Sequence, residues 1–503
     1  MLKQSKAMSD NGMNKPTYIS QKQMIILFLC FVLNLFLLSF AFNMLVGYGV
    51  CSFDQCVFTF IGGCAFQGDV ANCVMQAVKE PLFISVVFAS IGSLFVLLML
   101  NFVRHYRVSS FFVRLSVLYL CISPFWFAFY VIDRVKLPQW SHDSSFVEEN
   151  ASKPAMSDFS FPAKKRNLVF IYLESIELSF LGDASGIPGT NYMPELCELL
   201  KEGECFSAKG RSTGVTPLSA TGWTQASMFG SNTGYPLKMY SNSNLDHNLD
   251  AYYPTMISVS DILYANGYQN RVRFGSVASF ARRDAYFEQH GSFDVRDYAY
   301  SVNSGEQDIS NYDFWGYDDH TLFEYAKQDA LDLSKSGQPF CLVLETVDTH
   351  FPDGYTCPYC GHEYADEYGN ILRCNSRHIY DYVRWLQEQP FYEDTTIILM
   401  GDHPTMADFG DLDESPYQRK TYFCIINGVS ERETDDQRVY SAFDVAPTTL
   451  AAIGVDMKSD RFGLGTNLYS KEKTLFEQYG VEYMENGLCY SSPLMRRWFY
   501  GEP

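Results

Sequence analysis

The chain has 503 residues, of which 47% are hydrophobic and 16% aromatic, and its formal net charge at pH 7 is −20. This composition is too apolar for an intrinsically disordered protein, and the length is sufficient for a large core or for several domains. The negative charge argues against a nucleic-acid partner, because proteins that bind phosphate backbones carry an excess of Lys and Arg.

Three long apolar runs occupy the first quarter of the chain, at about residues 24–47, 82–103 and 112–132. The first two contain no charged residue, and the third contains one Arg near its start. Runs of about 20 apolar residues are long enough to span a bilayer and are rare in the cores of soluble proteins. The first run is also too long for a cleavable signal peptide. We therefore expect a membrane domain with three transmembrane helices over residues 1–133.

Basic residues beside these runs predict how the helices are oriented. Four lysines precede the first run: Lys3, Lys6, Lys15 and Lys22. Three arginines lie between the second run and the body of the third: Arg104, Arg107 and Arg114. Lys and Arg are enriched in cytoplasmic loops, so both of these flanks should be cytoplasmic. The loop 51–81 and everything after residue 132 should then lie outside the cytoplasm.

Cysteine usage agrees with this topology. The loop 51–81 contains an even number of cysteines, which predicts two disulfides in an oxidising compartment: Cys51, Cys56, Cys64 and Cys73. A second group follows much later in the chain: Cys357, Cys360 and Cys374. With His362 this group is compatible with a zinc site, but an oxidising compartment favours a disulfide and one further cysteine.

Residues 134–165 lack a sustained apolar period and are expected to form a linker, followed by a catalytic domain over residues 166–503. Four short apolar runs in that domain are typical of strands buried on both faces: 167–175, 340–348, 395–403 and 421–427. Helix-like segments lie between them: 256–267, 318–337 and 377–389. This alternation predicts an α/β domain with a central, mostly parallel sheet flanked by helices.

Acidic and histidine residues stand where the predicted strands end: Glu174, Asp348, His350, Asp402 and His403. Ligands bind at the carboxyl ends of strands in such sheets, so these side chains should meet at one edge. A single Glu or Asp is more often a helix cap or a surface charge, but their joint placement favours a site. Carboxylate and imidazole ligands suit one divalent metal ion, which would be Mn, Zn or Mg.

A hydroxyl-rich segment lies between the first predicted strand and the later ones. Residues 211–228, "RSTGVTPLSATGWTQASM", contain seven Ser or Thr residues, a composition that is common in loops. The last part of this segment can begin a helix, and the N–H groups of a helix N-terminus bind phosphate. A hydroxyl placed there beside a metal ion can act as a nucleophile, and we expect one of these residues to do so.

The motifs of this region resemble a group of enzymes in the alkaline phosphatase and sulfatase superfamily that are anchored by N-terminal transmembrane helices. The matching stretches include "NLVFIYLESIE", "TGWTQASMFGSNTGYPL", "FARRDAYFEQHGSFD" and "MGDHPTM", in the order of the family and over about residues 165–470. The group includes lipoteichoic acid synthases and phosphoethanolamine transferases. The "TVDTHFPDG" and "GYQN" elements are similar to those of its phosphoglycerol transferase I branch.

This resemblance implies roles for individual residues. The metal set would be the nucleophile together with Glu174, Asp402 and His403. Counting back from "GYP" at residues 234–236 identifies the nucleophile as Thr221, with Thr224, about one helical turn later, as the alternative. His350 is expected to contact the substrate and to act as a general acid or base. The other substrate-binding residues would be Arg283, Arg282 and Asp348.

The resemblance also implies a reaction, the metal-dependent transfer of phosphoglycerol from phosphatidylglycerol to a glycan such as a periplasmic glucan, through a phosphothreonine ester. The enzyme would be a multi-pass protein of the bacterial cytoplasmic membrane with its catalytic domain in the periplasm. A phosphoethanolamine transferase or a lipoteichoic-acid-synthase-like polymerase would use the same site, and a non-catalytic membrane sensor would have lost part of it. Sulfate-ester hydrolysis is not expected, because "TPLSA" lacks the Cys and the Arg of the sulfatase motif.

Overall fold

The computed structural model describes most of the chain after residue 135: residues 136–185, 189–207, 213–240, 252–313, 315–351, 353–407 and 419–502. Of the earlier residues it describes 52, 54, 55, 129 and 132. The chain divides into two compact units, residues 1–48 with 71–133 and residues 49–70 with 134–503. Every helix in the described part of the chain is too short or too polar to span a bilayer. Apart from residues 129 and 132, the three predicted transmembrane helices lie outside the described residues, as do the cysteines of the 51–81 loop.

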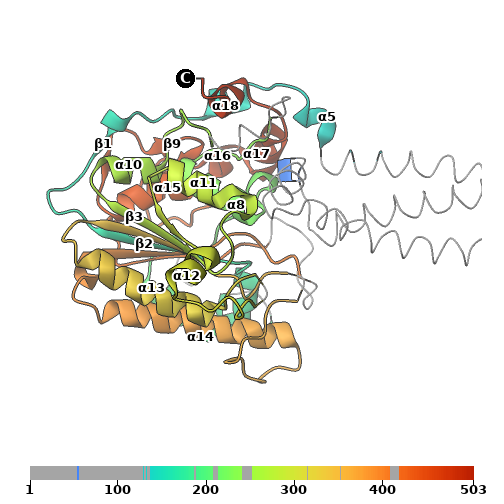
Figure 1. The fold of residues 1–503 in the computed structure, drawn as a ribbon. Helices are drawn as coiled ribbons and strands as arrows, with labels where there is room; N and C mark the ends of the chain where they lie inside the picture. Colours follow the sequence, from blue (N-terminus) through green and yellow to red (C-terminus); the bar gives the residue numbers. More distant parts are fainter. Residues whose placement is uncertain are drawn as a thin grey trace, which may run out of the picture. The chain divides into compact units, whose positions relative to one another are not determined.

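A six-stranded sheet lies at the centre of the second unit (Figure 1). The strand order is β4-β3-β5-β2-β6-β7, and every neighbouring pair is parallel except β6 and β7. The strands are β2 (Asn167–Leu173), β3 (Gln269–Phe274), β4 (Asp294–Arg296), β5 (Phe340–Glu345), β6 (Thr395–Gly401) and β7 (Phe423–Ile426). The predicted α/β class with a mostly parallel sheet is confirmed.

Helices cover both faces of this sheet (Figure 1). Along β2, Leu168, Phe170 and Tyr172 join one hydrophobic cluster. The helices that contribute to it include α8 (Thr224–Thr233), α10 (Val259–Ala265), α11 (Arg283–Gln289) and α15 (Ala442–Ala452). The alternate residues of β2 join a second cluster with α7 (Pro194–Glu202), α13 (Asp319–Ser334) and α14 (Glu367–Gln387). Burial on both faces explains why β2, β5 and β6 are apolar runs without polar alternation.

The sequence pattern does not predict β3 or β4, because β3 reads "QNRVRF" and carries two arginines. In the structure both arginines pair with Asp329, a fully buried residue of α13. Arg271 Nη1 lies 3.1 Å from Asp329 Oδ1, and Arg273 binds the same carboxylate through Nε and Nη2. A strand whose charges are paired in the interior therefore lacks the apolar pattern of its neighbours.

The segment predicted as a linker, 134–165, is folded where the structure describes it. It contains α5 (Leu137–Trp140), α6 (Phe146–Asn150) and β1 (Phe159–Ser160). The segment packs against elements from the last part of the chain. β1 pairs with β8 (Asp456–Met457), and α6 packs against α17 (Val481–Leu488) and α18 (Pro493–Phe499). Phe146 and Val147 of α6 are buried. The folded catalytic unit therefore begins before the predicted boundary at residue 166.

Asp54, from the 51–81 loop, belongs to the same unit as these helices. Its Oδ2 atom is 3.0 Å from Lys238 Nζ, and the two side chains are 8% and 3% exposed. Asp54 Oδ1 accepts hydrogen bonds from Met239 N and Trp140 Nε1 at 2.8 and 2.9 Å. The Lys238 ammonium also donates to the carbonyl oxygen of Leu488. A residue of the 51–81 loop is therefore built into the interior of the catalytic unit.

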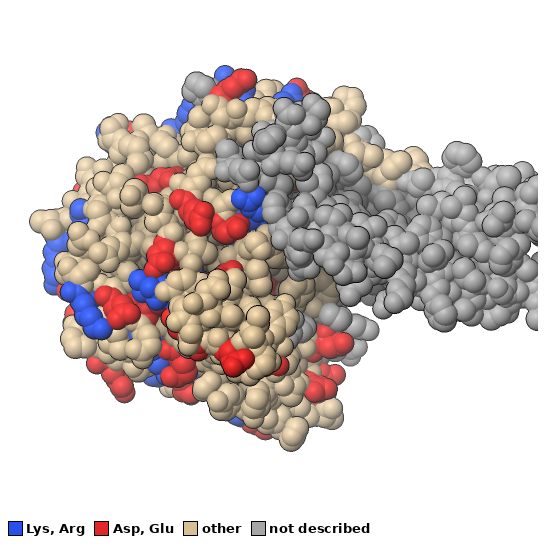
Figure 2. Space-filling view, in the orientation of Figure 1, with Lys and Arg blue, Asp and Glu red and all other residues tan. Residues whose placement is uncertain are grey.

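The described surface carries both signs of charge. On the face drawn in Figure 2, acidic and basic side chains are interspersed. Basic side chains of that face stand singly or in small groups beside acidic ones, a distribution unlike the basic stripe of a nucleic-acid-binding surface. Ion pairs at the described surface include Arg384 with Glu202 and Arg496 with Asp143.

Candidate functional site

Neighbouring strands that end at one edge of the sheet supply the acidic residues of the site. β2 and β6 are parallel, and Leu173 at the end of β2 pairs with Gly401 at the end of β6. Glu174 and Asp402 directly follow these two residues, so the register of the strands brings their carboxylates together. Glu174, Asp402 and His403 are 2%, 3% and 3% exposed. Their ligand atoms all lie within 4.8 Å of one another.

His403 connects the two carboxylates. Its Nε2 atom is 3.5 Å from Glu174 Oε1 and 3.4 Å from Asp402 Oδ2. Its Nδ1 atom is 3.0 Å from the carbonyl oxygen of Pro404, a contact that favours the proton on Nδ1 and leaves Nε2 free to bind a metal. Burial opposes the charged form of His403, but the Asp402 and Glu174 carboxylates outweigh it and raise its pKa.

Thr224 brings a hydroxyl to the same point. It is the first residue of α8, and its Oγ1 atom lies 3.3 Å from Glu174 Oε2 and 3.3 Å from His403 Nε2. The N–H groups in the first turn of a helix are not used within the helix, so they are available to an anion in front of it. A hydroxyl, the predicted metal set and a helix N-terminus therefore share one location.

Thr221, the nucleophile expected from the family spacing, stands one turn earlier. It ends the 3₁₀ helix η5 (Ser219–Thr221) and is buried, with its methyl group beside Gly230 of α8. Of the two candidate threonines, Thr224 is the one whose hydroxyl hydrogen-bonds the predicted metal set. The difference arises because α8 begins at Thr224, which directs the side chain of its first residue toward the strand ends.

The cluster has the geometry and the unmet bonding capacity of a metal site. Four contacts between its side chains measure 3.3 to 3.5 Å, with Thr224 beside one oxygen of Glu174 and His403 beside the other. A tetrahedron with metal bonds of about 2.1 Å has edges of about 3.4 Å. Asp402 Oδ2 is buried and accepts no hydrogen bond from the described residues. Burial, and then the Glu174 carboxylate, raise the pKa of Asp402 to about 7. Glu174, Thr224, Asp402 and His403 therefore fit one divalent ion.

The backbone beside the cluster has two features that hold the carboxylates in place. The backbone of Ser175 is in the left-handed conformation, with φ 57°. Its N–H donates to Asp402 Oδ1, and its hydroxyl donates to Glu174 Oε1. A Cβ atom on Gly401 would lie 1.9 Å from the carbonyl oxygen of Ile176, so only glycine fits at the end of β6. The "ES" and "GDH" sequences thus have a conformational role as well as a chemical one.

His350 follows β5, on the other side of β2. The hydroxyl of its neighbour Thr349 donates to the backbone carbonyl of Glu174 at 2.5 Å. The His350 ring packs against Trp315, with ring centroids 5.1 Å apart, and its Nδ1 atom is 2.7 Å from the carbonyl oxygen of Phe351. Burial lowers the pKa of His350 to about 4. His350 is therefore uncharged at neutral pH and able to accept a proton.

Arg283, predicted to bind substrate, is buried in an ion pair with Glu345, the last residue of β5. Its Nη2 atom donates to Ser276 Oγ at 2.8 Å, and its guanidinium lies over the ring of Phe274. Its buried Nε atom has no hydrogen-bond partner among the described residues. Burial raises the pKa of Glu345 to about 7. The Arg283 guanidinium opposes this rise, and the Glu174 carboxylate adds to it. Glu345, which no sequence pattern singles out, is therefore part of the charged surroundings of the site.

Arg282 and Asp348, the remaining predicted residues, make other contacts. Arg282 Nε is 3.3 Å from Asp284 Oδ1. The backbone N–H groups of Val347 and Asp348 donate to the carboxylate of Asp319 at the start of α13. Burial raises the pKa of Asp348 well above its ordinary value, and the Asp319 carboxylate adds to the effect. Asp348 thus ties the start of the His350 loop to α13.

The later cysteine group is also brought together, but differently from the expectation. Cys357 Sγ is 3.7 Å from both Cys360 Sγ and Cys374 Sγ, and all three residues are free thiols. The histidine beside them is His378, whose Nε2 atom is 3.3 Å from Cys374 Sγ, whereas His362 is exposed. The sulfur atoms are too far apart for the favoured disulfide in this structure. In the alternative zinc site, His378 takes the place expected for His362, because α14 begins ten residues before the predicted helix and includes both Cys374 and His378.

Comparison with known proteins places the chain in a family. The family model described as Sulfatase matches residues 166–455, more than half of the chain. A phosphoglycerol transferase I from Salmonella choleraesuis (strain SC-B67) is 30% identical over 345 residues, which are 67% of this chain and 43% of that protein. The resemblance to phosphoglycerol transferase I is thereby confirmed, and the chain matches less than half the length of this relative.

Solved structures are similar at lower identity. A protein in the alkaline phosphatase superfamily from Vibrio parahaemolyticus is 23% identical, with a TM-score of 0.46 over 63% of this chain and 72% of that one. The lipoteichoic acid synthase LtaP from Listeria monocytogenes is 18% identical, with a TM-score of 0.48 over 65% of this chain and 80% of that one. On the match over residues 166–455, which contains the whole Glu174, Thr224, Asp402 and His403 cluster, the chain belongs to the sulfatase family.

Proposed function

We propose that this protein is a metal-dependent transferase that moves phosphoglycerol from phosphatidylglycerol to a glycan acceptor. The observation that carries the proposal is the Thr224 hydroxyl, which hydrogen-bonds Glu174 and lies beside His403 at the start of α8. A positioned hydroxyl, a metal set and a helix N-terminus are the parts needed to transfer a phosphoryl group. The name of the Salmonella relative supports phosphoglycerol as the group that moves.

The transfer consists of two displacements with Thr224 as the nucleophile. In the first, Thr224 Oγ1 attacks the phosphorus of the donor, and the bond between phosphorus and the diacylglycerol oxygen breaks. In the second, an acceptor hydroxyl attacks the phosphorus of the phosphoglycerol-threonine ester, and Thr224 is released. A divalent ion held by Glu174, Asp402 and His403 would lower the pKa of the threonine hydroxyl and neutralise phosphate charge. The free N–H groups of α8 hold the phosphate oxygens in both displacements.

His350 moves one proton in each displacement. Because its pKa is lowered to about 4, it starts uncharged and accepts the proton of the attacking hydroxyl. It then gives this proton to the departing oxygen, which belongs to diacylglycerol in the first displacement and to Thr224 in the second. The proton taken up is thus returned each time, and no external acid is required.

The predicted membrane anchor supports a lipid donor. Phosphatidylglycerol remains in the bilayer, so a catalytic domain tethered to the same membrane meets it at a high effective concentration. We place the catalytic domain on the periplasmic side, where a glycan acceptor is available. The transmembrane helices and their orientation are part of this proposal.

Trapping the ester tests the proposal. Full-length protein incubated with phosphatidylglycerol that is labelled in its head group should gain a phosphoglycerol mass on the peptide that contains Thr224. Thr224→Ala should lose both the adduct and the transfer, whereas Thr221→Ala, a matched change one turn earlier, should keep both. An adduct that survives in Thr224→Ala and maps to residue 221 would identify Thr221 as the nucleophile instead.

The same assay separates the alternative functions. Labelled phosphatidylethanolamine in a parallel reaction should give no adduct, and transfer from this donor alone would replace phosphoglycerol with phosphoethanolamine in the proposal. If neither lipid modifies the protein with Mn, Zn or Mg present, the enzymatic function itself is contradicted, and a sensor or scaffold on this fold is supported.

A further inference from the structure

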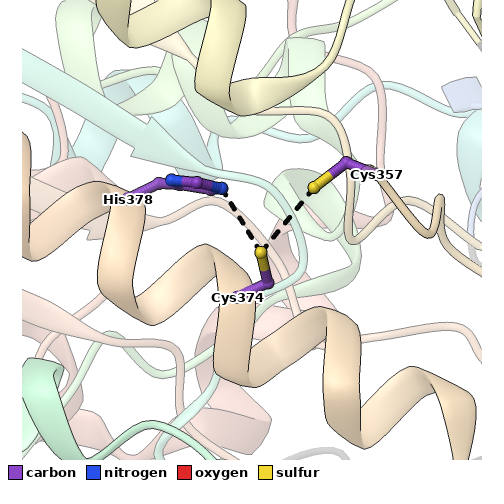
Figure 3. A group of neighbouring side chains, drawn as sticks. All are labelled: Cys357, Cys374 and His378. Atoms are coloured by element: carbon purple, nitrogen blue, oxygen red, sulfur yellow. Dashed lines mark hydrogen bonds between the residues drawn. The ribbon is translucent and has the colours of Figure 1, made fainter. Parts of the chain in front are cut away.

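A second group of metal-binding side chains lies apart from the Glu174, Asp402 and His403 site. Cys357 and Cys360 lie in the segment between β5 and α14, and Cys374 and His378 lie four residues apart on α14. Residues four apart on a helix share one face, so α14 presents a thiol and an imidazole together. Figure 3 shows the Cys374 side chain directed between those of His378 and Cys357.

The ligand atoms of Cys357, Cys374 and His378 all lie within 4.8 Å of one another, and Cys360 stands beside Cys357 at the edge of this group. The Sγ atom of Cys357 is 3.7 Å from those of Cys360 and Cys374, and His378 Nε2 is 3.3 Å from Cys374 Sγ. Tetrahedral zinc, with bonds of about 2.3 Å to sulfur and about 2.0 Å to nitrogen, separates two sulfurs by about 3.8 Å and sulfur from nitrogen by about 3.5 Å. A disulfide requires about 2.05 Å between sulfurs. Cys357 is equally far from two thiols, so neither pair is favoured for a disulfide.

The surroundings hold the ligands in these positions. Cys357 and Cys374 are both 3% exposed, so their thiols are withdrawn from solvent. The His378 ring packs edge-on against His320 and Tyr359, with ring centroids 5.3 and 5.9 Å apart. His320 and Tyr359 in turn stack on each other at 3.9 Å. This aromatic packing fixes the ring orientation that directs Nε2 toward the sulfur atoms.

We propose that Cys357, Cys360, Cys374 and His378 bind one zinc ion in a closed, structural site. Thiolates with an imidazole select zinc over Mg and Mn, which prefer oxygen ligands. The Cys-x2-Cys pair followed by Cys-x3-His matches the ligand spacing of structural zinc sites. Four protein ligands leave no open position for a substrate, so this ion is separate from the one at Glu174. The proposal does not depend on which reaction the enzyme catalyses.

The position of the site gives it a role, which is to brace the loop that carries His350. That loop folds back through two backbone hydrogen bonds, from Gly354 N to His350 O at 3.0 Å and from Tyr355 N to Asp348 O at 2.7 Å. Cys357 is two residues further along. A zinc ion bound by Cys357 and by the two ligands on α14 would fix the end of the loop to a long helix that is buried along one face.

Metal analysis of the full-length protein tests the site. In detergent-purified Glu174→Gln/Asp402→Asn protein, where the other site is disabled, we expect about one zinc per chain. His378→Ala in this background should lose the zinc, and His362→Ala, a matched change at the exposed histidine, should keep it. His378→Cys should also keep it, because a fourth thiolate completes the set. This rescue separates loss of a ligand from a failure to fold.

Cobalt gives a second readout. Protein reloaded with Co²⁺ should show a thiolate-to-metal charge-transfer band in the near ultraviolet, which the oxygen and nitrogen ligands at Glu174 cannot produce. The band should disappear in His378→Ala/Cys374→Ser protein and remain in His362→Ala protein. Equal zinc in His378→Ala and His362→Ala would overturn the proposal. So would non-reducing peptide mapping that finds Cys357 disulfide-bonded to Cys360 or Cys374 in most of the purified protein.

Discussion

Asp54→Asn should destabilise the catalytic unit strongly, because it leaves a buried ammonium without its counter-charge. Lys238 is 3% exposed, and its Nζ atom is 3.0 Å from Asp54 Oδ2 and 2.5 Å from the carbonyl oxygen of Leu488. Asparagine still offers an oxygen to Met239 N and Trp140 Nε1, so the substitution removes mainly the charge. Breaking one side of a buried ion pair costs about 3–5 kcal/mol. We expect about 3 kcal/mol, since the Leu488 carbonyl remains.

A double-mutant cycle with Lys238→Met isolates the pair. Asp54→Asn/Lys238→Met removes both charges and leaves neutral groups of similar size, so it should recover at least about 2 kcal/mol of the loss in Asp54→Asn. Urea unfolding of the full-length protein, followed by tryptophan fluorescence, measures the free energies. Asp143→Asn is the matched control, because Asp143 and its partner Arg496 are 47% and 39% exposed, and its cost should stay within about 1 kcal/mol.

Two results would refute this reasoning. One is an Asp54→Asn protein that is as stable as Asp143→Asn, because the ammonium would then not depend on Asp54. The other is a double variant that is no more stable than Asp54→Asn alone, because removal of the buried positive charge should then have been beneficial. Either result would mean that the 51–81 loop is not held by this ion pair.

Three further predictions concern the interior and the site. Asp329→Asn should lower the free energy of unfolding by about 3 kcal/mol, because Arg273, 1% exposed, loses its buried counter-charge and keeps only the more exposed Glu306; urea unfolding measures this change. Because the pKa of His350 is lowered to about 4, the pH profile of kcat/KM should show no loss from this residue until the pH falls toward 4, where protonation removes the base. His350→Gln should be slow at every pH and lack that limb. Chelation of divalent ions should abolish transfer, and Asp402→Asn should raise the metal concentration needed to restore it by at least about 10-fold.

The parts of the sheet that follow from the sequence are those where apolar burial alone determines the pattern. Val169 and Phe170 lie under helices on opposite faces of β2, so both faces are apolar and the run is recognised as a buried strand. In β3 the pattern fails, because Arg271 and Arg273 are stabilised by Asp329, a residue more than fifty positions away. No local signal reports such a partner, so a strand of this kind remains hidden in a single sequence.

The site, like the sheet, has parts that the sequence predicts and parts that it does not. Glu174, Asp402 and His403 are adjacent in space because parallel strands align their ends, a regularity that sequence reasoning can use. The choice between threonines depends on the residue at which α8 begins, and Trp223 before it provides no side-chain cap to mark that start. His378 was hidden for a similar reason. Only a helix that extends back past Cys374 places these two side chains on one face.

The packing of α6 against α17 and α18 has a practical consequence for anyone who wishes to study the catalytic unit without its membrane segments. Phe146 is 7% exposed, its ring is 5.3 Å from that of Tyr483, and it fills the space beside Gly487. A soluble version cut at residue 166 would delete this ring and uncover the apolar side of the last two helices, which favours aggregation. A version that starts at residue 136 keeps the helix in place but removes Asp54, so it should also carry Lys238→Met to avoid an unpaired buried ammonium.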